Sequence, residues 1–173
     1  AAARIGLDAK AGRFVLPVLD AEGNCRDLRR WRIPEAVCDE FGLTPSSSNA
    51  TWLPLRPGDG SGAPRLYDPF SCVTEGGDRP LFLAEGEWDA LRLADAGSAA
   101  FTVTDGAGKW PDGRHDNPPP DLTGRTVYVV GDHDPAGTRH NETGSLNCYL
   151  AGAAQVFAVQ WPEGFTEKGD ASD

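Results

Sequence analysis

The strongest constraint on the fold of this 173-residue chain is a repeated pairing of an apolar run with acidic residues. Residues 80–84 read PLFLA and lead into EGEWD at 85–89. Residues 126–130 read TVYVV and lead through Gly131 into Asp132, His133 and Asp134. Short apolar runs bounded by turn residues are typical of buried strands in an α/β sheet. The acidic residues therefore follow the carboxyl ends of two strands, where α/β folds bind their ligands.

Carboxylates that gather at one edge of a sheet repel one another unless a cation neutralises them. Hard divalent ions take oxygen ligands, so Mg²⁺ is the natural occupant of such a site, and Mn²⁺ is an alternative. The sequence therefore predicts a metal site built from both acidic clusters.

Each acidic residue also has a purely structural explanation. Asp134 before Pro135 is a common way to begin a helix, with the aspartate as the N-cap. Asp89 falls in a predicted first helical turn, where the helix dipole favours negative charge, and Glu85 is then a solvated loop residue. These explanations leave Asp132 unaccounted for. The equivalent placement of both clusters at strand ends favours one shared site.

The second part of the chain, residues 78–173, alternates predicted strands and helices. Strands are predicted at 81–84, 99–103, 126–130 and 155–159, and helices at 88–96, closed by Gly97, and at 135–150. Strands joined by helical crossovers form a parallel sheet with right-handed connections. We therefore predict an α/β fold in which helices flank a parallel sheet.

Residues 1–77 predict a small antiparallel β-rich subdomain that precedes this sheet. Predicted strands at 13–19 and 25–32 flank a turn in which Gly23 and Asn24 supply left-handed backbone. Two shorter strands are predicted at 51–55 and 65–67.

The formal net charge of −10 argues against a nucleic-acid surface that extends over the whole chain. A local basic strip is the remaining possibility. Strand alternation places Arg26, Arg30 and Arg32 on one face of the predicted strand 25–32, with Trp31 and Arg29 on the other. The strip is a candidate contact for the phosphates of a nucleic acid. The alternative is a solvated face above a packed Trp31.

The chain contains no apolar run of about 20 residues, the length that a membrane-spanning helix needs. Its four cysteines are scattered, without a zinc-ligand or disulfide pattern, which is typical of reduced thiols. We therefore expect no membrane association and a location in the cytoplasm.

The two acidic motifs, with their strand and helix context, resemble the Toprim domain. The first reads E-G-E-W-D-A-L at 85–91 and the second G-D-H-D-P-A-G at 131–137. Toprim domains are shared by bacterial-type DNA primases, topoisomerases and some nucleases, and the resemblance extends over about residues 80–173. The form of these motifs is most similar to phage and plasmid primases and primase–helicases.

The resemblance implies a role for each acidic residue. Glu85 matches the family's glutamate and is the candidate catalytic residue, acting as a general base. Asp132 and Asp134 match the D-x-D metal ligands. Asp89 matches an aspartate that primases add to the first motif, and it is a further candidate ligand.

Two weaker similarities extend the candidate site. Residues 168–173 resemble a K-D-x-x-[D/E] element of primase–helicases with Gly169 inserted, which makes Asp170 a candidate metal ligand; a flexible tail is the alternative. Lys109 follows a Gly-containing loop similar to one in phage primases and is a candidate phosphate contact, although a solvated loop lysine explains it equally well. The loop itself is not a Walker A sequence.

These observations predict the catalytic core of a phage- or plasmid-type DNA primase. It would use Mg²⁺ or Mn²⁺ to join nucleoside triphosphates into short primers on a single-stranded DNA template, with a fused or associated helicase as partner. The alternatives are a metal-dependent Toprim nuclease and a non-catalytic metal- or nucleotide-binding module of a replication protein. The β-rich subdomain ahead of the Toprim-like part favours the primase.

Overall fold

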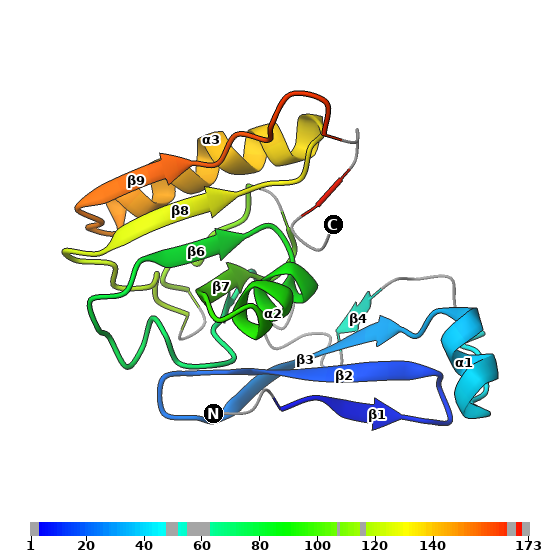
Figure 1. Ribbon diagram of the computed structural model, residues 1–173. Coiled ribbons are helices and arrows are strands. Elements are labelled where there is room, and N and C mark those ends of the chain that lie inside the picture. Colours follow the sequence, from blue (N-terminus) through cyan, green and yellow to red (C-terminus); the bar gives the residue numbers. More distant parts are fainter. Residues whose placement is uncertain are drawn as a thin grey trace. The chain divides into compact units, whose positions relative to one another are not determined.

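The computed structural model describes residues 4–47, 52–54, 63–106, 108–114, 117–165 and 169–170. The chain forms two compact units, Ala2–Ala63 and Pro64–Asp173 (Figure 1). The division falls 14 residues before the boundary between 77 and 78 that the sequence pattern indicated. The first unit is β-rich and the second is an α/β sheet with helices, so the predicted fold class is confirmed.

The first unit is a four-stranded antiparallel sheet in the order β1-β2-β3-β4. Its elements are β1 (Gly6–Asp8), β2 (Arg13–Leu19), β3 (Cys25–Arg32), α1 (Glu35–Phe41) and β4 (Trp52–Pro54). The short helix α1 was not predicted, and it ends at Gly42 in the left-handed conformation (φ 63°). The turn between β2 and β3 uses Gly23 at φ 82°, as predicted. Asn24 was wrongly predicted to share that conformation; its backbone and side chain donate hydrogen bonds to Asp20 instead.

The second unit is a five-stranded sheet in the order β5-β7-β6-β8-β9. Its elements are β5 (Leu66–Tyr67), β6 (Leu81–Ala84), α2 (Glu87–Asp95), β7 (Ala99–Val103), β8 (Thr126–Val130), α3 (Pro135–Leu150) and β9 (Gln155–Ala158). All neighbours pair in parallel except β5, which pairs antiparallel with β7.

The strand β5 explains why the two units divide before residue 77. Leu66 and Tyr67 pair with Val103 and Thr102 of β7, and the backbone N of Arg65 donates to Thr104 Oγ1 at 2.9 Å. The stretch that the sequence assigned to the first subdomain is therefore an edge strand of the α/β sheet. A two-residue strand carries no pattern that identifies its partner.

The order of the strands places a switch in chain direction between β6 and β8. From β6 the chain passes through α2 to β7 on one side, and from β8 it passes through α3 to β9 on the other side. Successive right-handed crossovers in opposite directions put their helices on opposite faces of the sheet. Figure 1 shows α2 in front of the strands and α3 behind them. The carboxyl ends of β6 and β8 are adjacent at this switch point, the usual ligand position in open α/β sheets.

The central strands β6 and β7 are largely buried on both faces of the sheet, which explains their nearly continuous apolar sequence. On one face, Leu81 and Leu83 of β6 belong to a fully buried cluster that includes Cys148 of α3. On the other face, Ala84 packs with Ala90 of α2 and Ala100 of β7. Residues of β6 alternate between these two clusters, as the period of two along a strand requires.

A row of aromatic rings crosses the second unit at matching strand positions. Phe82, Tyr128 and Phe157 are registered partners on β6, β8 and β9. Their successive ring centroids are 5.3 Å apart with interplanar angles of 20° and 23°. Cross-strand aromatic pairs stabilise a sheet and fix its register, so this row supports the alignment of the two acidic strand ends.

Within the described part of the chain, no helix has the length and apolar character needed to cross a membrane.

Candidate active site

The two acidic motifs are joined directly at the switch point. Ala84 and Val130, the last residues of β6 and β8, are registered partners. One residue beyond β6, Glu85 Oε2 accepts a hydrogen bond from the backbone N of Asp132 at 3.1 Å. The two strand ends that the sequence singled out are therefore in direct contact.

Asp132 lies at the centre of the negative charge. Burial raises its pKa to about 7, and the charges of Glu85, Asp89, Asp170 and Asp134 add to the effect in that order. Each of the four carboxylates is close enough to disfavour the ionised form of Asp132. The structure thus brings together all five acidic residues that the sequence singled out, although they come from three separate segments of the chain.

Glu85 is half-buried, and burial raises its pKa above the usual value for glutamate. The negative charge of Asp134 acts in the same direction, whereas the hydrogen bond from Asp132 and the positive charge of Arg139 oppose it. A carboxyl group with a raised pKa is better suited to accept a proton near neutral pH. Arg139, an exposed residue of α3, was missed in the sequence because nothing in its surroundings resembles a known motif.

Asp134 has the structural role that its position before Pro135 indicated. Its Oδ1 accepts hydrogen bonds from the backbone N of Ala136 at 2.7 Å and of Gly137 at 2.8 Å, so it is the N-cap of α3. The cap and the acidic cluster are not exclusive, because the charge of Asp134 also acts on Glu85 and Asp132.

The first turn of α3 packs directly on the backbone of the second motif. A Cβ atom added to Gly137 would lie far under 3.0 Å from the backbone oxygen of Asp132, and one added to Gly131 would meet the backbone of Gly137. Glycine at both positions allows the helix to begin against the strand end. This close approach fixes where Asp132 leaves the sheet.

The end of the chain reaches the same place. The backbone N of His133 donates to the backbone oxygen of Gly169 at 2.8 Å, and Asp170 follows Gly169 directly. Lys168 and residues 171–173 of the predicted element lie outside the described residues. Trp161 also contacts the second motif, through a hydrogen bond from Nε1 to the backbone oxygen of Gly131 at 2.9 Å. The sequence offered no signal for this contact beyond the aromatic character of Trp161.

The other basic candidates are in the first unit, on β3. Arg30 and Arg32 pair with Val15 and Arg13 of β2, so they share one face as predicted. Burial, together with the positive charges of Arg30 and Arg32, lowers the pKa of Arg13. Arg13 Nη1 also donates to the backbone oxygen of Arg30 at 3.1 Å. Arg13 therefore lies beside the strip on β2, but the residue is only 1% exposed, so its charge acts on the strip from a buried position.

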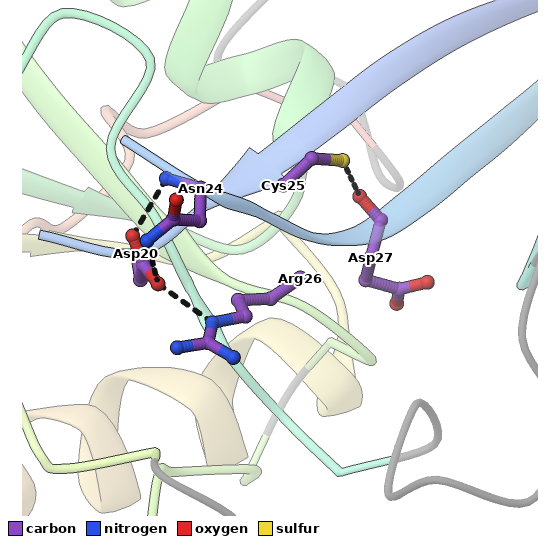
Figure 2. A network of polar contacts seen from close by, with 5 residues as sticks. All are labelled: Asp20, Asn24, Cys25, Arg26 and Asp27. Atoms are coloured by element: carbon purple, nitrogen blue, oxygen red, sulfur yellow. Dashed lines mark hydrogen bonds and ion pairs between the residues drawn. The ribbon is translucent and has the colours of Figure 1, made fainter. Parts of the chain in front are cut away.

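Arg26 differs from these arginines because it falls at an irregularity in the ladder. Between Val18 and Leu19 the register shifts, so the alternation that relates Arg30 to Arg32 does not extend to Arg26. Arg26 Nε instead lies 2.6 Å from Asp20 Oδ2. Figure 2 shows Asp20 joined to both Asn24 and Arg26, with Cys25 Sγ donating to the backbone oxygen of Asp27 at 3.3 Å.

Lys109 is exposed in the loop that follows the carboxyl end of β7. Its backbone N donates to the backbone oxygen of Gly106 at 3.3 Å, which closes a tight turn. Since β7 is parallel to β6, this loop leaves the sheet at the same edge as Glu85.

The donor chemistry of the acidic cluster fits a hard divalent cation. Its carboxylate oxygens are the hard donors that such an ion prefers, and after burial the charges of the neighbouring carboxylates act to raise the pKa of Asp132. Ligand geometry is a separate matter: among the described residues, no three His, Cys, Asp or Glu side chains are already arranged around one position for a metal ion. Binding a cation would therefore require side chains of the cluster to rotate.

No family model and no curated protein sequence matches this chain. Solved structures do match its fold. The Aquifex aeolicus primase (zinc-binding and RNA polymerase domains) has a TM-score of 0.55 at 20% identity, covering 94% of this chain and 37% of that one. A DnaG primase catalytic domain bound to single-stranded DNA has a TM-score of 0.55 at 17% identity, covering 93% and 46%. In fold, this chain is similar to primase catalytic cores.

The primase fragment of the bacteriophage T7 primase–helicase is a further neighbour, with a TM-score of 0.51 at 16% identity. The match covers 94% of this chain and 61% of that fragment. This chain therefore spans between about a third and three fifths of the primase structures that it matches. At these identities the similarity concerns the fold, and the chemistry has to be argued from the residues of this chain.

Proposed function

We propose that this chain is the catalytic core of a DNA primase, with residues 64–173 as a Toprim domain and the preceding β-rich unit as its partner subdomain. The observation that carries the proposal is the convergence of four acidic side chains on Asp132 at the switch point of the sheet. The order of a β-rich unit followed by such a sheet supports it, because the primase cores share that fold.

The acidic cluster is proposed to bind Mg²⁺ or Mn²⁺, with Asp132, Asp134, Asp89 and Asp170 as the residues that hold it. A divalent ion bound there supplies positive charge that neutralises a nucleoside triphosphate. Asp134 Oδ1 forms the α3 cap, so Oδ2 is the oxygen proposed to bind the ion. Mg²⁺ generally retains several water ligands, so the four carboxylates need not all bind it directly.

Glu85 is proposed as the general base. In primer synthesis a 3′-hydroxyl oxygen forms a bond to the α-phosphorus of a nucleoside triphosphate, and the bond from that phosphorus to the β-phosphate oxygen breaks. The hydroxyl proton passes to Glu85, and pyrophosphate leaves. The raised pKa of Glu85 supports this role, because a carboxylate with a higher proton affinity removes a hydroxyl proton more effectively.

Basic residues of both units are proposed to contact phosphates. Arg30 and Arg32 form a positive strip on one face of the antiparallel sheet, suited to the backbone of a single-stranded template, with the buried Arg13 beside them. Arg26 is expected to contribute less, since its guanidinium is engaged by Asp20. Lys109 is proposed to contact the triphosphate from the loop after β7.

The proposal has three further parts: a phage or plasmid replication system, a helicase as fused or associated partner, and a cytoplasmic location. The form of the two motifs supports the first, and the similarity to the T7 primase–helicase fragment supports the second. The replication role supports the third, because primers are made where DNA is copied.

Primer synthesis on single-stranded DNA tests this proposal directly. The chain is incubated with labelled nucleoside triphosphates and Mg²⁺ or Mn²⁺, and template-dependent oligomers are expected. Asp132→Asn should abolish them, whereas Asp121→Asn, an exposed position ahead of β8, should leave them unchanged. Degradation of the DNA without synthesis would identify a nuclease instead. Neither activity in the presence of metal binding would identify a non-catalytic module.

Template binding by the arginine strip has its own measurement. Because each phosphate contact to a single strand contributes about 0.7 to the slope of log affinity against log salt, Arg32→Ala should reduce that slope by about this amount. Arg26→Ala is the matched comparison on the same strand, and a smaller change is expected from it. Equal slopes in all variants would exclude the strip as a template contact.

A further inference from the structure

The segment after β9 returns to the acidic cluster and is attached there at two points. Trp161 Nε1 donates to the backbone oxygen of Gly131 at 2.9 Å. Eight residues later, the backbone oxygen of Gly169 accepts from the backbone N of His133 at 2.8 Å. Gly131 and His133 are the residues on either side of Asp132, so the two attachments bracket the residue at the centre of the cluster.

Aromatic contacts reinforce this attachment. The rings of Trp161 and Phe165 are stacked, with centroids 4.4 Å apart and an interplanar angle of 10°. Phe165 in turn lies against the imidazole of His133, with centroids 5.9 Å apart and an angle of 57°. Pairs with these geometries are favourable beyond their buried area. The three rings thus connect the segment after β9 to the second acidic motif through side chains as well as backbone.

The attachment has an electrostatic consequence, because it determines where Asp170 lies. Asp170 follows Gly169 directly, and its charge acts on Asp132. Bringing a further carboxylate to a cluster that already holds four is unfavourable, since like charges repel. The hydrogen bonds and ring contacts offset this repulsion, so a segment that would otherwise move away from the cluster is kept against it.

We propose that Trp161, Phe165 and His133 form an aromatic latch that positions Asp170 in the acidic cluster and thereby increases its affinity for a divalent cation. The proposal rests on the proposed function only in that a cation binds to this cluster. The latch residues are positioning residues: they act by placing Asp170. Groups that orient metal ligands typically change metal affinity by about 10–100-fold when they are removed.

Mn²⁺ affinity of the full chain, measured by calorimetry and by the loss of the free-ion EPR signal, tests the latch without an activity assay. Trp161→Ala is expected to weaken Mn²⁺ binding about tenfold, as is Asp170→Asn. The double variant should bind no more weakly than Asp170→Asn alone, because the latch acts through Asp170. Trp161→Phe keeps the stacked ring without the indole N–H and should fall between wild type and Trp161→Ala.

Tyr149→Ala is the matched control, because Tyr149 is an aromatic residue of the same unit that is 70% exposed on α3. It should bind Mn²⁺ as the wild type does. Far-UV circular dichroism and thermal unfolding identify any variant that has lost its fold, and Trp161→Phe replaces Trp161→Ala in the comparison if the latter unfolds.

Two results would overturn the latch: Mn²⁺ affinity that does not change in Trp161→Ala and Trp161→Phe, or losses that add fully in the double variant. A wild-type chain that does not bind Mn²⁺ would overturn it as well. A chain that binds Mn²⁺ and shows the expected pattern, but makes no primers, would retain the latch and contradict the primase proposal.

Discussion

Glu85 and Asp132 are joined by a hydrogen bond from the backbone N of Asp132 to Glu85 Oε2 at 3.1 Å. The two residues follow adjacent strands and lie 47 positions apart in the sequence. One oxygen of the proposed general base is therefore also a structural contact that holds the second acidic motif against the first. The two roles of Glu85 make different demands on its side chain, and substitution can separate them.

Glu85→Gln keeps an oxygen that accepts the hydrogen bond from Asp132 but removes the negative charge. We expect its unfolding free energy to equal or exceed that of the wild type, because one source of repulsion in the cluster is gone. Glu85→Ala loses the acceptor and should be less stable by about 1 kcal/mol. Urea unfolding measures both, and primer synthesis should be lost in both. Synthesis retained in Glu85→Gln would exclude Glu85 as the base.

Asp134 also has two roles that substitution can separate, because it both caps α3 and contributes charge to the cluster. Asn is a good N-cap, so Asp134→Asn should retain the stability of the wild type, whereas Asp134→Ala should lose about 1–2 kcal/mol. Both remove a carboxylate and should weaken Mn²⁺ binding. Thermal unfolding and Mn²⁺ titration of the two variants test this; equal stability of Asn and Ala variants would contradict the capping role.

Gly137 tests the packing of α3 on the second motif. A Cβ at this position would overlap the backbone of Asp132, and backbone atoms cannot move aside as the end of a flexible side chain can. We expect Gly137→Ala to reduce the unfolding free energy by about 3 kcal/mol and to weaken Mn²⁺ binding. Gly6→Ala, where the nearest atom to the new Cβ is 3.6 Å away, is the control and should change neither. Wild-type stability in Gly137→Ala would show that the helix start can shift.

Most of the strands, the helices α2 and α3 and the two acidic strand ends were predictable because each depends on short-range sequence, whereas the short elements β1 and α1 were missed. Apolar runs, the N-cap at Asp134 and the end of α2 near Gly97 are properties of neighbouring residues. The edge that Glu85 and Asp132 share then follows from the rule that parallel strands align their carboxyl ends. A local pattern together with one general rule of topology was enough to locate the centre of the site.

What the sequence did not reveal depends on contacts between distant residues. Strand β5 has two residues, too few to indicate whether they pair with β7 or with the antiparallel sheet. Arg26 left the predicted face because the register shifts opposite Leu19, and a bulge has no marker in the alternation of β3. The contact of Trp161 with Gly131 spans 30 residues and involves an indole that any apolar pattern would assign to packing.

His140 is a buried residue of α3 whose ring is not part of the acidic cluster. Burial lowers its pKa to about 4, and a hydrogen bond to the backbone of Leu83 raises the pKa in part. A histidine with a lowered pKa stabilises the fold above pH 6.5, and this contribution is lost as the pH falls from 6.5 to about 4. The wild type should lose about 3 kcal/mol of unfolding free energy over this range from His140. His140→Asn keeps a donor but cannot titrate, so urea unfolding of this variant should show a correspondingly smaller loss; an unchanged pH dependence would contradict the assignment.

Asp132 should give the opposite dependence, since its pKa is raised to about 7 by burial and by the charges of its neighbours. A carboxyl group whose pKa is higher in the folded chain than in the unfolded chain stabilises the fold at low pH, and that contribution is lost as the pH rises from about 4 to 7. The Asn side chain in Asp132→Asn does not titrate. The wild type and the variant both contain His140, so its contribution cancels in the difference between their melting temperatures, and the pH dependence of that difference reports on Asp132. Allowing for solvent screening of this half-buried group, we expect the variant to gain about 5 °C relative to the wild type between pH 4.5 and pH 7.5.

Adding Mn²⁺ at pH 7.5 should raise the melting temperature of the wild type and remove most of that difference, because a bound cation favours the ionised carboxylate. A difference that is independent of both pH and Mn²⁺ would mean that Asp132 titrates as an ordinary surface carboxylate and that the cluster does not act on it.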